Sequence, residues 1–230
     1  MDDGHQHRDI QGGGARAAVF GVSDGLVSNV ALILGMAGAH VDAGAVRVAG
    51  IAGLIAGAFS MGTGEYVSMR AQSELMMREL DVERAAIRRN PEIERRELSA
   101  IYVSRGIDRV LADELSAKMM EDPELALETH AREELGIDPK ATGRPWQAAI
   151  SSFVMFALGA LLPLLPWLFS GSASPVWISV VLGGTGALAV GAALAHFTGR
   201  SWWFSAGRQL LISGVAAAVT YGAGHLVASF

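Results

Sequence analysis

Five long apolar segments constrain the fold of this chain more than any other feature of its sequence. A helix of roughly 20 apolar residues, rising about 1.5 Å per residue, covers a hydrocarbon core about 30 Å thick, so each segment is long enough to cross a bilayer. We therefore expect an all-α integral membrane protein with five transmembrane helices. The expected spans are residues 17–39, 46–69, 148–169, 176–197 and 209–229.

The charged residues are concentrated in one part of the chain. Residues 70–144 hold 13 of the 18 Lys and Arg residues and 17 of the 23 Asp and Glu residues, although only 18% of the whole chain is charged. Because this segment separates the second span from the third, we expect a helical domain inserted between helices two and three. The expected regions are a tail (1–16), helices one and two (17–69), the polar domain (70–144) and helices three to five (145–230).

Helix start and stop patterns divide the polar segment. Asn-Pro at 90–91 and Asp-Pro at 122–123 each place an N-cap residue before a proline that suits the first helical turn. Gly106 and Gly136 are typical helix stops. We expect the second span to continue as a helix to about Arg89, followed by helices over 91–104, 107–121 and 123–135.

Basic residues near the ends of spans predict the orientation, because they are retained on the cytoplasmic side. The 70–144 segment and the N-terminus are therefore expected inside, and the C-terminus, after an odd number of spans, outside. Arg47 is the one basic residue on the wrong side. The acidic N-terminus argues against a cleaved signal peptide. We predict a bacterial inner-membrane location.

Asp24 and Glu65 are the only carboxylates inside the five apolar segments. A charge at membrane depth costs at least about 2.5 kcal/mol on insertion scales, so such groups usually face a cavity or partner and mark a pathway. Met61 lies four residues before Glu65 and shares its helix face. Two carboxylates and a thioether suit a borderline divalent transition metal better than magnesium or calcium. The alternative for Met61 is ordinary apolar packing.

The polar segment carries further pairs of ligand-type residues. Glu94 and Glu97 lie three residues apart on one expected helix, and His130 and Glu134 lie four apart on another, so each pair can converge on one ion. Glu83, on the continuation of the second span, can reach the same place. The alternative is a solvated charged surface, since a segment with 17 acidic residues contains such pairs by chance.

Four stretches, in this order along the chain, resemble the vacuolar iron transporter family, which includes bacterial members. They are GVSDGLVSN (21–29), SMGTGEYVSMRAQ (60–72), ERRELSAIYVSRG (94–106) and HAREELGI (130–137). The resemblance implies a five-helix homodimer that moves ferrous iron, often with manganese, out of the cytoplasm in exchange for protons.

The same resemblance implies two groups of metal ligands. The group within the membrane corresponds to Asp24, Met61 and Glu65. The group in the polar domain corresponds to Glu83, Glu94, Glu97 and Glu134.

The polar domain departs from the family pattern at three positions. Ala86 stands where the family has a second glutamate of a pair, and His130 and Ala131 stand where it has two methionines. Histidine can replace a thioether as a ligand, whereas alanine cannot. The sequence therefore predicts His130 as a ligand, with Glu79 and Glu133 as candidate substitutes for the missing ones.

The leading hypothesis is a transporter of Fe2+ that also tolerates Mn2+, Zn2+ or Co2+, with protons, the lipid bilayer and a second copy of the chain as partners. We expect no enzymatic activity, no resident cofactor and no nucleic-acid partner. One alternative is a membrane-anchored protein that stores or senses metal without transporting it. The other is an intramembrane hydrolase that uses Ser213 with His196 or His225.

Overall fold

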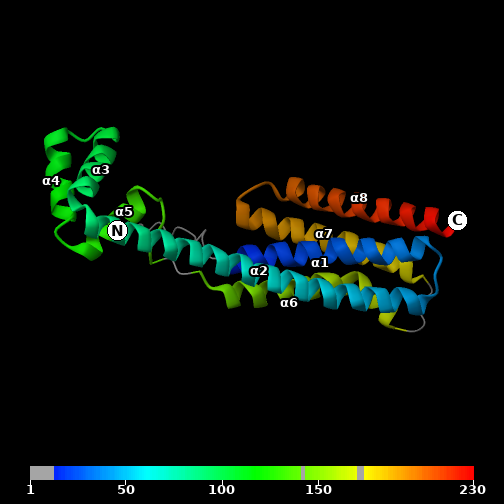
Figure 1. Cartoon of the computed structure of the whole chain (residues 1–230). Helices are drawn as coiled ribbons and strands as arrows, with labels where there is room; N and C mark the ends of the chain where they lie inside the picture. Colours follow the sequence, from blue (N-terminus) through cyan, green and yellow to red (C-terminus); the bar gives the residue numbers. More distant parts are fainter. Residues whose placement is uncertain (1–12, 141–142, 170–173) are drawn as a thin grey trace. The chain divides into compact units, whose positions relative to one another are not determined.

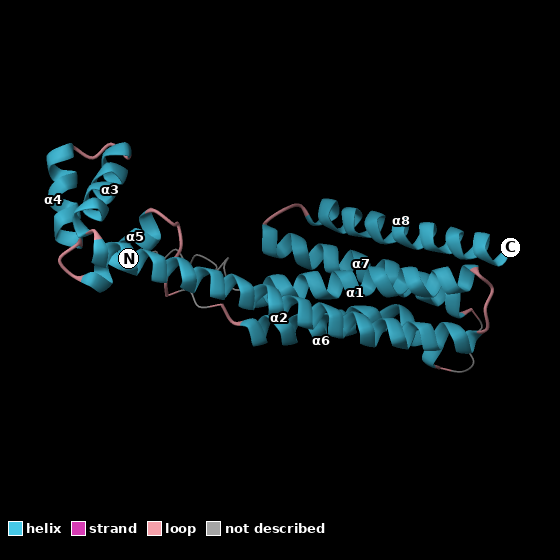
Figure 2. Cartoon of the chain, viewed as in Figure 1, coloured by secondary structure: helices cyan, strands magenta, loops and turns pink. Residues whose placement is uncertain are grey.

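The computed structural model describes residues 13–140, 143–169 and 174–230, and these are folded into helices joined by short loops (Figure 1, Figure 2). Eight helices and no strand occur in these ranges, so the all-α prediction is confirmed. The helices are α1 (Gly13–Gly38), α2 (Ala43–Arg89), α3 (Pro91–Ser104), α4 (Arg109–Met119), α5 (Pro123–Glu133), α6 (Pro145–Leu168), α7 (Pro175–Thr198) and α8 (Trp202–Ala228).

Five of the helices, α1, α2, α6, α7 and α8, are long and apolar enough to cross a membrane. The five predicted spans are thus confirmed, but the helices extend beyond the apolar segments. The largest extension that the sequence did not predict is at α8, which begins at Trp202 and not at residue 209. Arg208 interrupts the apolar run without interrupting the helix, because one polar side chain does not disturb backbone hydrogen bonding.

The second span continues as a helix to Arg89, as predicted. With 47 residues, α2 is about 70 Å long at 1.5 Å per residue. A hydrocarbon core is only about 30 Å thick, so the polar half of α2 must extend beyond it.

Contacts between residues divide the chain into two compact units. The apolar unit consists of Met1–Val67 and Arg144–Phe230, and the polar unit consists of Ser68–Gly143. The first part of α2 belongs to the apolar unit and the rest of it to the polar unit.

In the apolar unit, α1 packs against α6, α7 and α8 (Figure 1). A Cβ atom at Gly25 of α1 would collide with the main chain of Phe156 in α6, so glycine allows these two helices to approach closely. Buried residues then join α1, α2 and α6 in one core, namely Ile33, Val46, Leu164 and Trp167.

Arg47, the basic residue that the orientation rule places on the wrong side, is satisfied within the apolar unit. Its Nε donates a hydrogen bond of 2.8 Å to the main-chain oxygen of Trp167. Trp167 lies in the last turn of α6, where carbonyl groups lack helical partners and a cation is favourable. This position therefore reflects a helix-end contact and not an error in the span.

In the polar unit, α3, α4 and α5 pack together, and two small apolar clusters hold them (Figure 2). One cluster joins the polar half of α2 to α5 through Ile87, Ala126 and Leu127. The other joins α3 to α4 through Leu98, Tyr102 and Ala112.

The helix ends in the polar unit follow capping chemistry. Asp122 caps α5 as predicted, because its carboxylate accepts a hydrogen bond from the backbone N of Glu124 at 2.9 Å. Asp108 likewise accepts from Val110 N at 2.9 Å, so α4 starts at Arg109 and the predicted start at residue 107 is wrong. Asn90 occupies the N-cap position of α3 but makes no side-chain capping bond.

Candidate metal sites

A groove between α1 and α2 brings together all three residues predicted as ligands within the membrane. Asp24 lies on α1, and Met61 and Glu65 lie on α2. The groove has a volume of about 370 Å³. Its lining consists of Asp24, Ser28, Gly53, Gly57, Ser60, Met61, Gly64, Glu65 and Phe156.

Small residues on one face of α2 create this groove. Gly53, Gly57 and Gly64 replace side chains that would otherwise fill it, and a Cβ atom at Gly57 would collide with the ring of Phe156. From Gly53 to Glu65 the groove follows α2 for about 18 Å at 1.5 Å per residue. This length is more than half the thickness of a hydrocarbon core of about 30 Å.

The two carboxylates of the groove differ in their partners. Asp24 Oδ1 accepts a hydrogen bond of 3.1 Å from Ser28 Oγ, one helical turn further along α1. Glu65 Oε1 is buried and makes no hydrogen bond within the described part of the chain, but Arg16 Nη2 of α1 lies 3.5 Å from it. The Arg16 side chain is 76% exposed, whereas that of Glu65 is 17% exposed. Glu65 thus has a weakly held counter-charge and an oxygen without a donor.

Met61 takes part in both the groove and the core. It lines the groove and also packs against the buried cluster of Ala58, Phe156 and Ala160. The position of Met61 therefore agrees both with a role as a metal ligand and with ordinary apolar packing. Chemically, the groove offers carboxylate oxygens and one thioether, a set that suits a borderline divalent cation.

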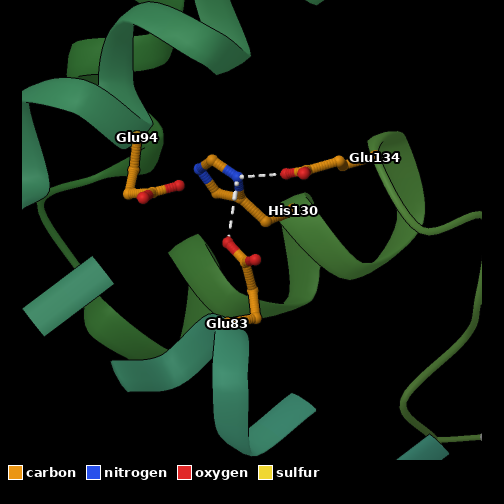
Figure 3. Close-up of side chains that lie close together, drawn as sticks. All are labelled: Glu83, Glu94, His130 and Glu134. Carbon is orange, nitrogen blue, oxygen red and sulfur yellow. Dashed lines mark hydrogen bonds and ion pairs between the residues drawn. The ribbon is translucent and has the colours of Figure 1, made fainter. Parts of the chain in front are cut away.

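A second group of ligand atoms lies entirely within the polar unit (Figure 3). One ligand atom from each of four residues lies within 4.8 Å of the others. The residues are Glu83 of α2, Glu94 of α3, His130 of α5 and Glu134 directly after α5.

His130 is the centre of this group. Its side chain is fully buried, and its Nδ1 lies 3.2 Å from Glu83 Oε1 and 3.4 Å from Glu134 Oε2. Figure 3 shows Glu94 and Glu134 on opposite sides of the imidazole ring. Of the polar atoms in this group, His130 Nε2 is buried with no hydrogen-bond partner in the part of the chain that is described, and Glu83 Oε1 makes no hydrogen bond there beyond its ion-pair contact with His130 Nδ1. Unpaired buried atoms of ligand type are what a cation would satisfy.

Burial raises the pKa of two carboxyl groups in this cluster, those of Glu83 and Glu94. Desolvation raises the pKa of Glu83 above its ordinary value, and the neighbouring carboxylates raise it further, while His130 opposes them. Desolvation also raises the pKa of Glu94, with Glu97 as the next cause. These acids hold protons more tightly than in water, and a cation that binds there displaces protons.

Comparison with known proteins identifies the family. A sequence profile of the VIT family matches residues 15–225. The chain belongs to the VIT family. Among its relatives, the vacuolar iron transporter of Acanthamoeba castellanii is 36% identical over 232 residues, covering 97% of this chain and 83% of that protein. Vacuolar iron transporter 1 of Eucalyptus grandis is 33% identical over 93% of this chain and 86% of that protein. Vacuolar iron transporter 1 of Arabidopsis thaliana is 32% identical over 90% and 83%, respectively.

Not every ligand implied by the VIT family resemblance joins the polar-unit group. Glu97 is exposed and lies outside the four residues, although its charge contributes to the raised pKa of Glu94. Glu133, a candidate substitute, pairs with Arg105. Glu79 is exposed and is not part of the group. His130, which departs from the VIT family pattern, is therefore the residue that completes the group.

The hydrolase alternative lacks the contact it needs. The Oγ of Ser213 is buried and has no hydrogen-bond partner in the described ranges, so no histidine activates it there. His225 instead packs edge-on against His40, with ring centroids 5.7 Å apart.

Sequence reasoning missed several residues of the groove. Ser28 could have been found, because it lies four residues after Asp24 on the same helix face. Arg16 and Phe156 could not, since their proximity to α2 depends on how separate helices pack.

Proposed function

We propose that this VIT family protein transports a divalent transition-metal ion across a membrane, with ferrous iron as the main substrate and manganese as a second one. The observation that carries the proposal is the groove itself: two carboxylates and a thioether, from two helices, line one cavity inside an apolar helical unit. Carboxylates in hydrocarbon are costly unless they serve a passing cation. The relatives named vacuolar iron transporters support the same function.

In this proposal the polar unit faces the cytoplasm and collects the ion. Glu83, Glu94, His130 and Glu134 bind it first, and Asp24, Met61 and Glu65 take it through the membrane and out of the cytoplasm. Carboxylates lose protons when they bind metal, so counterflowing protons can drive the transport. Assembly as a homodimer and a bacterial inner-membrane location stay predictions from the sequence.

The test is flux of ferrous iron into proteoliposomes under anaerobic conditions, with and without a pH gradient. We expect flux through the wild-type protein and a fall to the background of empty vesicles for Glu65→Gln. The matched control is Glu114→Gln, the same substitution at an exposed position of α4, which should transport normally. Normal flux through Glu65→Gln would refute the role of the groove.

A storage or sensing protein is the second candidate, and the compact polar-unit group favours it, because that site needs no groove. Binding of metal by the wild-type protein without any flux would support this candidate and exclude transport.

A further inference from the structure

Asn29 of α1 is a buried polar residue that is not among the proposed ligands of the groove. It follows Ser28 directly and is 2% exposed. Its Nδ2 donates a hydrogen bond of 2.6 Å to the main-chain oxygen of Ala160 in α6. Because a carbonyl oxygen can only accept, this bond fixes which end of the amide faces α6. The other end of the amide is the oxygen Oδ1.

Asn29 Oδ1 is buried and has no hydrogen-bond partner among the described residues. A Cβ atom placed on Gly53 of α2 would lie 3.1 Å from it. Gly53 lines the groove at the end opposite Glu65. The amide oxygen therefore lies beside the deeper end of the groove, where an unpaired acceptor is unfavourable unless something occupies it in the working protein.

We propose that Asn29 Oδ1 is a second ligand position for the transported cation, deeper in the membrane than Asp24, Met61 and Glu65. This inference rests on the proposed function. Along the sequence of α1, Ser28 lies between Asp24 and Asn29, and its hydroxyl group donates a hydrogen bond to Asp24. The side-chain oxygen atoms of Asp24, Ser28 and Asn29 therefore occur in this order along the helix, from the first ligand position to the second. An amide oxygen is a good ligand for a divalent cation but carries no net charge, so it can receive the ion and also release it.

A purely structural role for Asn29 makes a different prediction, and two substitutions separate the two roles. Asn29→Leu and the ionised form of Asn29→Asp both lack the donor to Ala160, but only the aspartate keeps an oxygen at this position. If the bond to α6 is what matters, both variants fail alike. If the oxygen is a ligand, the aspartate variant keeps much more flux than the leucine variant.

The experiment measures initial rates of ferrous iron flux in proteoliposomes and, separately, the affinity of the detergent-purified protein for ferrous iron. For Asn29→Leu we expect the rate to fall by at least about tenfold with loading affinity changed by less than about threefold, which indicates a step after binding. For Asn29→Asp we expect a rate at least about fivefold above that of Asn29→Leu, although the added charge should slow release of the ion relative to the wild type.

Gly53→Ala provides a second test that leaves the amide and its bond to α6 intact. The new methyl group would lie beside Asn29 Oδ1 and 2.5 Å from the flexible end of Leu32, which can move aside. It should slow flux without weakening loading. Gly214→Ala, where no atom lies within 4 Å of the new methyl group, is the control and should transport normally.

Equal loss of rate in Asn29→Leu and Asn29→Asp, or wild-type flux through Asn29→Leu, would overturn this inference while leaving the proposed function in place. An absence of flux through the wild-type protein would overturn the proposed function and this inference together.

Discussion

Replacing Glu83 with glutamine should separate the stability of the polar unit from its response to metal. In the metal-free protein, burial raises the pKa of this carboxyl group, so keeping it ionised at neutral pH opposes folding. Its Oε1 makes no hydrogen bond in the described structure, although His130 Nδ1 lies 3.2 Å from it. A buried polar atom left without a partner costs about 1–3 kcal/mol. Glutamine keeps a polar group at this position but removes the buried charge, so we expect the free energy of unfolding of the metal-free protein to rise by an amount on the order of 1 kcal/mol.

Metal should stabilise the wild-type protein much more than Glu83→Gln. A cation present at about 100 times its dissociation constant stabilises the state that binds it by about 2.7 kcal/mol, which corresponds to about 100-fold slower opening of the protected structure. The wild type should show this effect with Mn2+, a divalent ion that binds carboxylates and is stable in air. Glu83→Gln removes a charged ligand that contacts His130, so most of the effect should be lost.

Hydrogen exchange of the full-length protein in detergent measures both quantities in α3 and α5. Tryptophan fluorescence would not, because all five tryptophans belong to the apolar unit. We expect metal-free Glu83→Gln to exchange about fivefold more slowly than the wild type, equivalent to about 1 kcal/mol. Glu114→Gln is the control and should match the wild type. Full protection of Glu83→Gln by Mn2+, or faster exchange in its metal-free form, would refute the assignment of Glu83 as a buried ligand.

Three further predictions follow from the two sites. Because the pKa values of Glu83 and Glu94 are raised, the folded protein retains protons that the unfolded chain releases above pH 4.5. As pH rises through this window, the stability of the metal-free protein should therefore fall and its affinity for Mn2+ should rise. Titrations between pH 5 and 8 measure both quantities, and an affinity that does not change with pH would contradict the raised pKa values. Glu94→Gln should weaken Mn2+ binding, measured by calorimetry, by at least about tenfold, whereas Glu97→Gln, at an exposed position, should change it by less than about threefold. Equal losses of affinity in the two variants would show that Glu97 is also a ligand. Arg16→Gln should strengthen cation binding in the groove by no more than about fivefold, because the arginine side chain is mostly exposed and exposed ion pairs contribute about 0.2–1 kcal/mol. Weaker binding by this variant would show that Arg16 does not compete with the ion.

The apolar pattern predicted the helices well because their positions depend on local sequence. Residues 17–39 and 46–69 correspond to α1 and the first half of α2, and Asp122 caps α5 as expected. The start of α4 was predicted wrongly, because an aspartate cap outweighs the apolar residue at 107.

The composition of the sites was harder to predict than the helices. Spacing along one helix placed His130 with Glu134 correctly, but it also placed Glu97 beside Glu94. A spacing of three residues allows two side chains to converge without requiring it, and here the packing of α3 against its neighbours buries Glu94 and leaves Glu97 exposed. Contacts between helices, such as that of Arg16 with Glu65, depend on tertiary packing and have no local pattern.

The contact of Arg16 with Glu65 gives the proposed transport cycle a simple charge balance. When a divalent cation displaces Arg16 and binds to Asp24 and Glu65, the charges of the ion and the two carboxylates cancel. When the ion has left, two carboxylates and Arg16 together carry one negative charge, which a single proton can neutralise. Hydrocarbon penalises net charge, so the empty groove should return with Arg16 and one proton in place of the ion. Arg16→Gln removes one of these positive charges, and a second proton must replace it. We therefore expect Arg16→Gln to move more protons per metal ion than the wild type in vesicles that report internal pH and metal together, and an unchanged ratio would show that Arg16 takes no part in the return step.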